Sequence, residues 1–221
     1  MSEPVRDEKQ KKGVAKHIYK TFVEGPQKKM RELESTARID PLTGLPNLRA
    51  LNEQMDLLDG LWTRNHRQGI EEPKGAIIAL DLTALHATNK TYGDPAGDQY
   101  LIDVSTSTNA AIRRDVDKAF RKGDRSDEYT LVLLGEEEKK GIEIVMDRVD
   151  LELKTREIEA RKKYPGISYS VSMYGVTFGG QRPPLLAFNM AHTRINNLKS
   201  GAEAETGERG KYVGRHIIDK V

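Results

Sequence analysis

The stretch KAFRKGDRSDEYTLVLLG, residues 118–135, decides how the middle of this 221-residue chain folds. Residues 118–121 and the apolar run 129–134 have strand-like length and composition, and the segment between them is rich in Gly, Asp and Ser, as turns are. The stretch therefore predicts a β-hairpin. Asp127 and Glu128 stand where the turn enters the second strand. Adjacent like charges are unfavourable unless a cation or a hydrogen-bond network compensates them, so this pair is a candidate functional site.

The segments on either side of the hairpin predict a mixed α/β architecture. Apolar runs predict strands over AIIALDL (76–82) and ISYSVSMYGVTF (167–178), and the tail at 213–218 has the composition of an edge strand. Apolar residues at helical spacing predict helices, which cover about 48–67, a short stretch ending near 89, 95–114, 142–164 and 185–199. We therefore expect a palm-like α/β sandwich: a mixed central sheet that contains the hairpin, with flanking helices, and the strand ending in Asp81 beside the hairpin turn.

The chain divides into a short N-terminal arm, residues 1–38, and one larger domain, residues 39–221. Within the arm, Val14, Ile18 and Phe22 recur every four residues and form one apolar stripe of a helix. This stripe has two interpretations: the arm packs on its own domain, or it is a stalk that pairs two copies of the chain. The sequence does not separate them.

Composition excludes several classes of protein. The 36 Lys and Arg residues nearly balance 34 Asp and Glu residues, which gives a net charge of +2 and no support for bulk binding of nucleic acid or an anionic membrane. There is no cysteine, so disulfides and thiolate metal sites are excluded. No apolar run has the length of a membrane span, and the charged N-terminus lacks the apolar core of a signal peptide. We expect a cytoplasmic protein.

Five blocks of sequence, in order and at matching distances, resemble the GGDEF domains of diguanylate cyclases. The first two blocks resemble D-x-L-T-G-L-x-N and D-x-D-x-F-K-x-x-N-D-x-x-G-H-x-x-G-D. GDRSDEY takes the place of the signature, and the last two blocks resemble the strand that reads S-x-G and the helix A-D-x-A-L-Y-x-A-K. The blocks are DPLTGLPN (40–47), DLTALHATNKTYGDPAGD (81–98), GDRSDEY (123–129), SYSVSMYGV (168–176) and AHTRINNLK (191–199). Each block alone is modest evidence, and the resemblance rests on all five together.

The resemblance implies a metal site for a nucleoside triphosphate. Asp81, the carbonyl of Leu82 and Asp127 would hold Mg²⁺ or Mn²⁺, and Glu128 would support Asp127 in catalysis. Oxygen ligands of this kind suit Mg²⁺. Two such ions, about 3.5–4 Å apart, can activate a ribose 3′-hydroxyl and stabilise the leaving pyrophosphate. Cations would also compensate the paired acids.

The resemblance further implies that Asn89 and Asp98 read guanine and that Lys199 neutralises triphosphate oxygens. A carboxylate accepts hydrogen bonds from N1–H and the 2-amino group of guanine, and adenine lacks this pair of donors. An amide can form a further hydrogen bond along the same edge of the base. Taken singly, these residues have ordinary explanations, as turn, cap and helix C-terminal residues. Their joint occurrence at the family's spacing favours the functional interpretation.

The chain departs from the family pattern at several positions. In the signature, the turn is either lengthened by two residues or carries Arg125 and Ser126 in place of two glycines. Arg125 would then either contact phosphate or block the pocket. His86 stands where the family has lysine, which weakens phosphate binding at neutral pH. Arg114 and Asp117 form an R-x-x-D like the family's product-inhibition site, although a charged helix end explains them equally well.

The sequence therefore predicts a diguanylate cyclase-like nucleotidyltransferase. It would condense two GTP into cyclic di-GMP with release of pyrophosphate, and it would act as a metal-dependent homodimer because two active sites must face each other. A regulatory partner could act through the N-terminal arm. The alternative is a catalytically inactive, diverged GGDEF domain that binds GTP or cyclic di-GMP and signals through protein contacts. A cyclase that accepts ATP is a third possibility, against which Asp98 argues.

Overall fold

The computed structural model of the chain describes residues 37–123, 126–135, 139–206 and 216–218; beyond residue 200 it describes the backbone alone. Residues Met1–Ala37 and Arg38–Val221 form two separate units. The following description concerns the second unit. The predicted helical stalk in the N-terminal arm lies outside the described residues.

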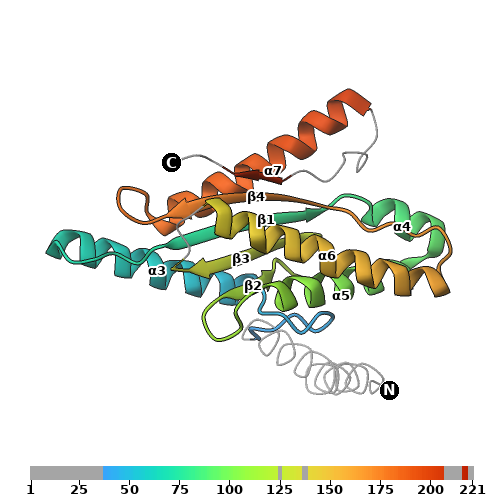
Figure 1. The fold of residues 1–221 in the computed structure, drawn as a ribbon, viewed down its shortest axis with the longest axis horizontal. Helices are drawn as coiled ribbons and strands as arrows, with labels where there is room; N and C mark the ends of the chain where they lie inside the picture. Colours follow the sequence, from blue (N-terminus) through green and yellow to red (C-terminus); the bar gives the residue numbers. More distant parts are fainter. Residues whose placement is uncertain (1–36, 124–125, 136–138, 207–215, 219–221) are drawn as a thin grey trace, which may run out of the picture. The chain divides into compact units, whose positions relative to one another are not determined.

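The second unit is built on a five-stranded sheet with the order β2-β3-β1-β4-β5. Neighbours among the first four strands pair antiparallel, and β5 pairs parallel to β4. The predicted hairpin is confirmed: β2 and β3 pair directly and form one side of the sheet (Figure 1). The strands are β1 (Gly75–Leu82), β2 (Lys118–Arg121), β3 (Glu128–Leu134), β4 (Val171–Phe178) and β5 (His216–Ile218).

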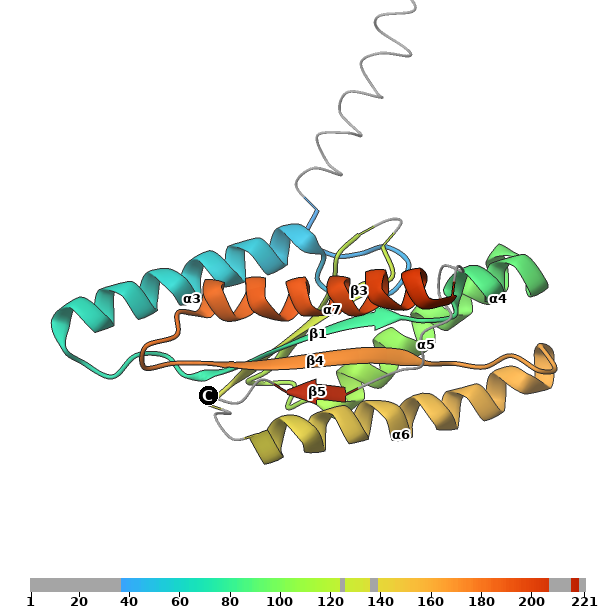
Figure 2. The ribbon, with the colours of Figure 1, turned by 90° about the horizontal axis from the view of Figure 1, so that it is seen from above.

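Helices cover both faces of the sheet, which confirms the predicted α/β sandwich. Figure 2 shows α3 and α7 on one face and α5 and α6 on the other. The helices are α3 (Leu48–Gln68), α4 (Leu85–Tyr92), α5 (Asp94–Ala111), α6 (Lys139–Lys163) and α7 (Pro184–Thr206). α5 ends before the predicted residue 114 because the backbone at Ile112 is extended, which buries that side chain. α7 extends beyond residue 199 through a stretch with good helix formers, alanine and glutamate.

Alternating side chains along each strand divide the core between the two faces. On β1, Ile78 and Leu80 belong to the cluster shared with α5 and α6, whereas Ile77 and Ala79 belong to the cluster shared with α3 and α7. Asp81 has the same parity as Ile77 and Ala79. Its carboxylate therefore lies on the face covered by α7, at the end of an otherwise apolar strand.

The register of the strands brings a row of polar residues to this end of the sheet. Asp81 is opposite Glu128 on β3 and opposite Ser172 on β4. Beyond β2, the backbone N–H of Lys122 donates to the carbonyl of Glu128 at 3.0 Å, so Lys122 continues the same row. Thus four side chains, Lys122, Glu128, Asp81 and Ser172, lie side by side on the α7 face. We call them the polar row.

Candidate functional site

Asp81, Asp127 and Lys199 meet at the end of β1. The Lys199 Nζ donates to Asp81 Oδ1 at 2.8 Å and to Asp127 Oδ2 at 3.4 Å. Asp127 lies just before β3, and its carbonyl accepts a hydrogen bond from the Leu82 N–H at 3.3 Å. The fold thus brings together three residues that lie 46 and 72 positions apart in the chain, 127 − 81 and 199 − 127.

The electrostatics of this cluster favour a positive charge between the two carboxylates. Asp81 is completely buried, and the Lys199 side chain is 25% exposed above it. Burial alone would lower the pKa of the Lys199 ammonium, but the hydrogen bond and charge of Asp81, together with Asp127, raise that pKa above its usual value. The two carboxylates therefore hold a positive charge between them, and in this structure the lysine supplies it.

These oxygens also suit a divalent cation. Mg²⁺ is usually bound by one or two carboxylates plus phosphates and water. Asp81 and Asp127 would provide the carboxylates, with the carbonyl of Leu82 beside them. Within residues 37–123, 126–135, 139–206 and 216–218, no group of three or more His, Asp and Glu side chains converges on one point. The charged oxygen ligands at this site are therefore two carboxylates, a number that suits a divalent cation whose other ligands are water or a bound phosphate.

Glu128 belongs to a second polar cluster, next to the first. Its Oε2 lies 2.5 Å from the Lys122 Nζ and 3.7 Å from Nδ1 of the buried His192. The longer separation exceeds a hydrogen bond, so Lys122 is the direct partner. His192 and Lys122 together lower the pKa of the Glu128 carboxyl to about 2, against the effect of burial. On its other side, His192 Nε2 contacts Thr130 Oγ1 at 2.9 Å.

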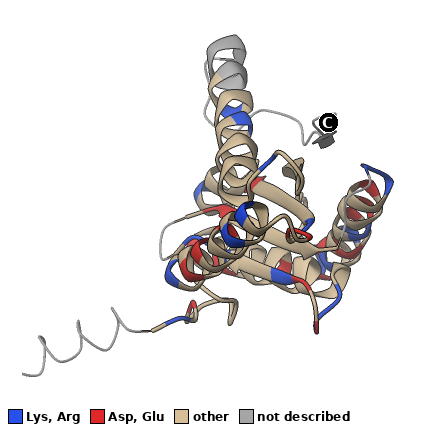
Figure 3. Ribbon diagram, turned by 90° about the vertical axis from the view of Figure 1, so that its left-hand side faces the viewer, with Lys and Arg blue, Asp and Glu red and all other residues tan. Residues whose placement is uncertain are grey.

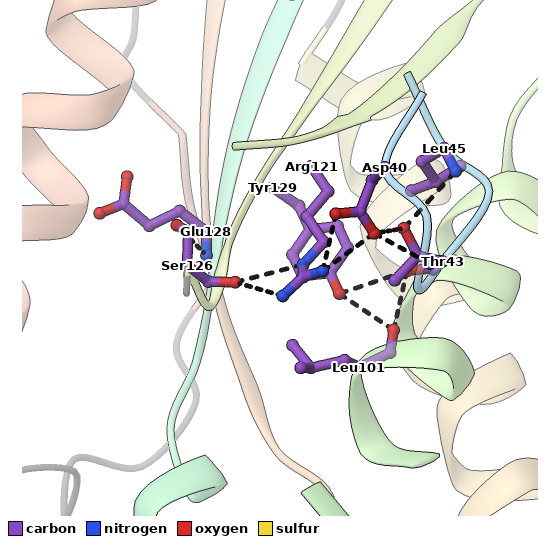
Figure 4. Close-up of polar contacts among 9 residues, drawn as sticks. Asp40, Thr43, Leu45, Leu101, Arg121, Ser126, Glu128 and Tyr129 are labelled. Atoms are coloured by element: carbon purple, nitrogen blue, oxygen red, sulfur yellow. Dashed lines mark hydrogen bonds and ion pairs between the residues drawn. The ribbon is translucent and has the colours of Figure 1, made fainter. Parts of the chain in front are cut away.

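A buried ion pair anchors the signature turn from the opposite side of β3. Figure 4 shows Arg121 and Glu128 pointing to opposite sides of the strand. The Arg121 Nη1 donates to both carboxylate oxygens of Asp40 at 2.9 Å, and its Nε and Nη2 donate to the Ser126 carbonyl at 3.2 and 3.1 Å. Arg121 and Asp40 are 2% and 1% exposed. Arg121 therefore links the loop that precedes α3 to the residue adjoining Asp127.

Asp40 is held in place by its own loop. The N–H and hydroxyl of Thr43 donate to Asp40 Oδ1 at 2.9 and 2.6 Å. Burial raises the pKa of Asp40, but Thr43 and Arg121 outweigh it and keep that pKa below its usual value. The sequence predicted no role for Asp40. The sequence feature that could have indicated a role is the position of this acid in a loop dense in Pro and Gly. Its partner Arg121 lies 81 residues further along the chain, so no local pattern connects the two.

The predicted guanine readers lie at the junction of α4 and α5. Asn89 is on α4, and its buried Oδ1 finds no hydrogen-bond partner within the described ranges. It packs against Gly97 of α5 so closely that a Cβ there would lie 1.7 Å from Oδ1. Asp98, the next residue, is exposed. A buried amide oxygen without a donor is expected to receive one from a ligand or water.

The R-x-x-D residues have different environments. Arg114 is exposed, whereas Asp117 is buried. The guanidinium of Arg113 donates to both Asp117 oxygens at 2.8 Å, and the Leu134 N–H donates to Oδ1 at 3.0 Å. These partners, opposed by burial, keep the pKa of Asp117 below its usual value. Asp117 thus already serves the end of the hairpin, and product binding at Arg114 and Asp117 stays a prediction. Arg125 lies outside the described residues.

Comparison with known proteins identifies the family. A profile described as diguanylate cyclase, GGDEF domain, matches residues 37–203, more than half of the chain. The chain therefore belongs to the GGDEF family. None of the curated proteins compared with the chain matches it. No helix in the described part of the chain is long and apolar enough to cross a membrane, and acidic and basic residues are interspersed over its ribbon (Figure 3).

Solved structures share the fold. Diguanylate cyclase SiaD from Pseudomonas aeruginosa, in complex with its activator SiaC, is 20% identical, with a TM-score of 0.61 over 97% of this chain and 75% of that chain. The GGDEF domain of DgcB from Caulobacter crescentus, in complex with c-di-GMP, is 17% identical, with a TM-score of 0.60 over 82% and 95%. The coiled coil and GGDEF domain of DgcB is 16% identical, with a TM-score of 0.53 over 92% and 98%. At such identities the likeness shows the fold.

Proposed function

We propose that this protein is a metal-dependent diguanylate cyclase, which condenses two GTP into cyclic di-GMP and releases two pyrophosphates. The observation that carries the proposal is the convergence of Asp81, Asp127 and Lys199, with the Lys199 Nζ 2.8 and 3.4 Å from the two carboxylates. Family membership supports the reaction class.

Each residue would have a defined task in this reaction. Asp81, Asp127 and the Leu82 carbonyl would hold Mg²⁺ or Mn²⁺, and the ion would supply the charge that stabilises the triphosphate and acidifies the attacking hydroxyl. Asp127, of which Glu128 is the supporting neighbour, would accept the 3′-hydroxyl proton. Lys199 would exchange its carboxylate partners for triphosphate oxygens when the ion binds.

Asn89 and Asp98 would select guanine. The Asn89 Oδ1, which lacks a hydrogen-bond donor in the described structure, would accept from the 2-amino group, and the exposed Asp98 would accept from N1–H. Adenine offers no such pair of donors. A hydroxyl on one GTP must attack the α-phosphorus of the other in line, so the active complex would be a homodimer, paired or controlled through the arm at residues 1–38. The reaction belongs in the cytoplasm, where GTP is available.

One observation favours the alternative, a GGDEF domain that binds GTP or cyclic di-GMP without turnover. Glu128 is neutralised by Lys122 at 2.5 Å, with His192 nearby. It therefore contributes less negative charge to a cation than a free carboxylate would. The two functions differ in whether pyrophosphate is released.

The test is incubation of the full chain with GTP and Mg²⁺ or Mn²⁺, with cyclic di-GMP and pyrophosphate measured separately. We expect both products, and we expect Asp127→Asn to slow their formation by about 100-fold or more, the scale of a lost general base. Asp56→Asn, on the exposed face of α3, is the matched control and should leave the rate unchanged. Binding of GTP without pyrophosphate, at concentrations that give a dimer, would overturn the cyclase and establish the alternative.

A further inference from the structure

Ser172 is the member of the polar row that no role yet explains. It lies on β4 directly opposite Asp81 of β1. Its side chain is completely buried, and its Oγ finds no hydrogen-bond partner among the residues that the structure describes. Along β4 it alternates in step with Tyr174, Val176 and Phe178, whose side chains point to the α7 face. Ser172 therefore faces α7 together with Asp81.

A serine is an unfavourable choice at such a position if folding alone is considered. The other residues of β4 on this face pack in an apolar cluster. A buried hydroxyl without a partner is destabilising because it has lost its hydrogen bonds to water, and alanine would avoid that cost. An unsatisfied buried group in a folded protein usually marks a ligand, an ion or a water that completes it.

The nearest candidate for that partner is the cation site. Directly opposed residues on antiparallel strands have Cβ atoms about 4.5–5.5 Å apart. The Ser172 hydroxyl is therefore a neighbour of the Asp81 carboxylate, although it is not bonded to it. Lys199 Nζ contacts the same carboxylate at 2.8 Å and would be displaced by a divalent ion. Mg²⁺ and Mn²⁺ bring bound water, which needs hydrogen-bond acceptors in its surroundings.

We propose that Ser172 belongs to the divalent-cation site: its Oγ accepts a hydrogen bond from a water molecule bound to the ion that Asp81 holds. This inference rests on the proposed function, because it requires the ion. Groups that orient the shell of a metal commonly change its affinity by 10- to 100-fold. With a single hydroxyl involved, we expect a change of about tenfold.

The test compares Ser172→Ala with Ser107→Ala in the full chain. Ser107, on α5 at the other face of the sheet, is also completely buried and also has an unpartnered Oγ in the described structure. Mn²⁺ alone is titrated while the free ion is followed by electron paramagnetic resonance, and unfolding in urea is measured in the presence of a chelator. Ser172→Ala should weaken Mn²⁺ binding about tenfold without lowering the stability of the metal-free protein. Ser107→Ala should leave Mn²⁺ binding unchanged, and Ser172→Thr should retain it.

The outcomes separate this inference from the proposed function. If the wild type binds Mn²⁺, Asp81→Asn does not, and Ser172→Ala binds as tightly as the wild type, the role of Ser172 is refuted and the cation site stands. If Ser172→Ala weakens binding but also destabilises the metal-free protein, Ser172 is a structural residue and the inference is wrong. If the wild type binds no Mn²⁺ either alone or with a non-hydrolysable GTP analogue, the metal-dependent function and the role of Ser172 fail together.

Discussion

The ion pair between Arg121 and Asp40 predicts a large loss of stability when only one partner is changed. Asp40→Asn removes the negative charge but keeps an oxygen for Thr43. Arg121, which is 2% exposed, would then be a buried guanidinium whose remaining acceptors, the amide oxygen at position 40 and the Ser126 carbonyl, carry no charge. Removing one partner of a buried pair costs about 3–5 kcal/mol, because the other charge stays buried without compensation.

That loss is a large fraction of the free energy of unfolding, which is about 5–15 kcal/mol for an ordinary domain. The double variant Asp40→Asn/Arg121→Met should lose less than the sum of the two single variants, because it leaves no charge unpaired. We expect a coupling free energy of about 2 kcal/mol, within the range of contacting residues. Because Arg121 also positions Ser126, next to Asp127, Arg121→Met should weaken Mn²⁺ binding as well.

Urea unfolding of the four proteins, followed by circular dichroism, measures the double-mutant cycle. The pH dependence gives a second test. Since the folded pKa of Asp40 is lowered, its stabilising contribution is present above the unfolded value of about 3.8. It is lost as pH falls through the folded pKa, so the wild type should lose this contribution on acidification and Asp40→Asn should not.

The control is the exposed pair between Arg38 and Glu53, whose side chains are 63% and 43% exposed. Glu53→Gln should leave the unfolding free energy unchanged, because solvent screens such a pair. Strict additivity of Asp40→Asn and Arg121→Met would show that the two residues do not act as a unit. A loss from Asp40→Asn below about 1 kcal/mol, the scale of an exposed pair, would refute the reasoning from burial.

Two further predictions concern the remainder of the site. Gly97→Ala should displace Asn89, because the new Cβ would lie 1.7 Å from its Oδ1. The affinity for GTP, measured by calorimetry, should therefore fall. The control Gly60→Ala, in open space on α3, should leave the GTP affinity unchanged and stabilise the helix by about 0.5–1 kcal/mol. Unchanged GTP affinity in Gly97→Ala would exclude Asn89 from the binding site. Lys122→Met should raise the pKa of Glu128 from about 2 towards its usual value in a carbon-13 NMR titration. In the wild type, the stability that the Glu128 carboxylate contributes is present above about pH 4.5 and is lost as pH falls towards 2. In Lys122→Met this contribution should be lost at a higher pH. An unchanged pKa of Glu128 in the variant would show that Lys122 is not its partner.

Local patterns were sufficient for the architecture. The run AIIALDL predicted β1 because it is apolar throughout and ends in an acid, and residues 118–121 and 129–134 predicted the hairpin from strand composition around a turn. These signals act over a few residues, where alternation and turn chemistry dominate. The site residues on these elements followed from the resemblance to GGDEF domains, and the expected α/β layout placed the strand that ends in Asp81 beside the hairpin turn.

The partners of those residues depended on the fold. Lys122 was a residue of the turn without an assigned role, and only the register of β2 on β3 places it against Glu128. His192 had no predicted role, and the packing of α7 places it beside Glu128 and Thr130. No periodicity along the chain encodes such pairs, because they join segments that meet only after the sheet forms.

Sequence patterns alone were enough to predict the helices and strands and their order along the chain, the resemblance to the family, and the acids at the ends of β1 and β3 that lie close together. Tertiary structure decided how charge is compensated there: Lys199 between Asp81 and Asp127, Arg121 buried against Asp40, and Ser172 opposite Asp81 without a partner. The physical reason is that the two kinds of interaction depend on different distances, one along the chain and one through space. Helices and strands follow from neighbours in the chain, whereas hydrogen bonds and ion pairs act over a few ångströms in space and follow from register and packing.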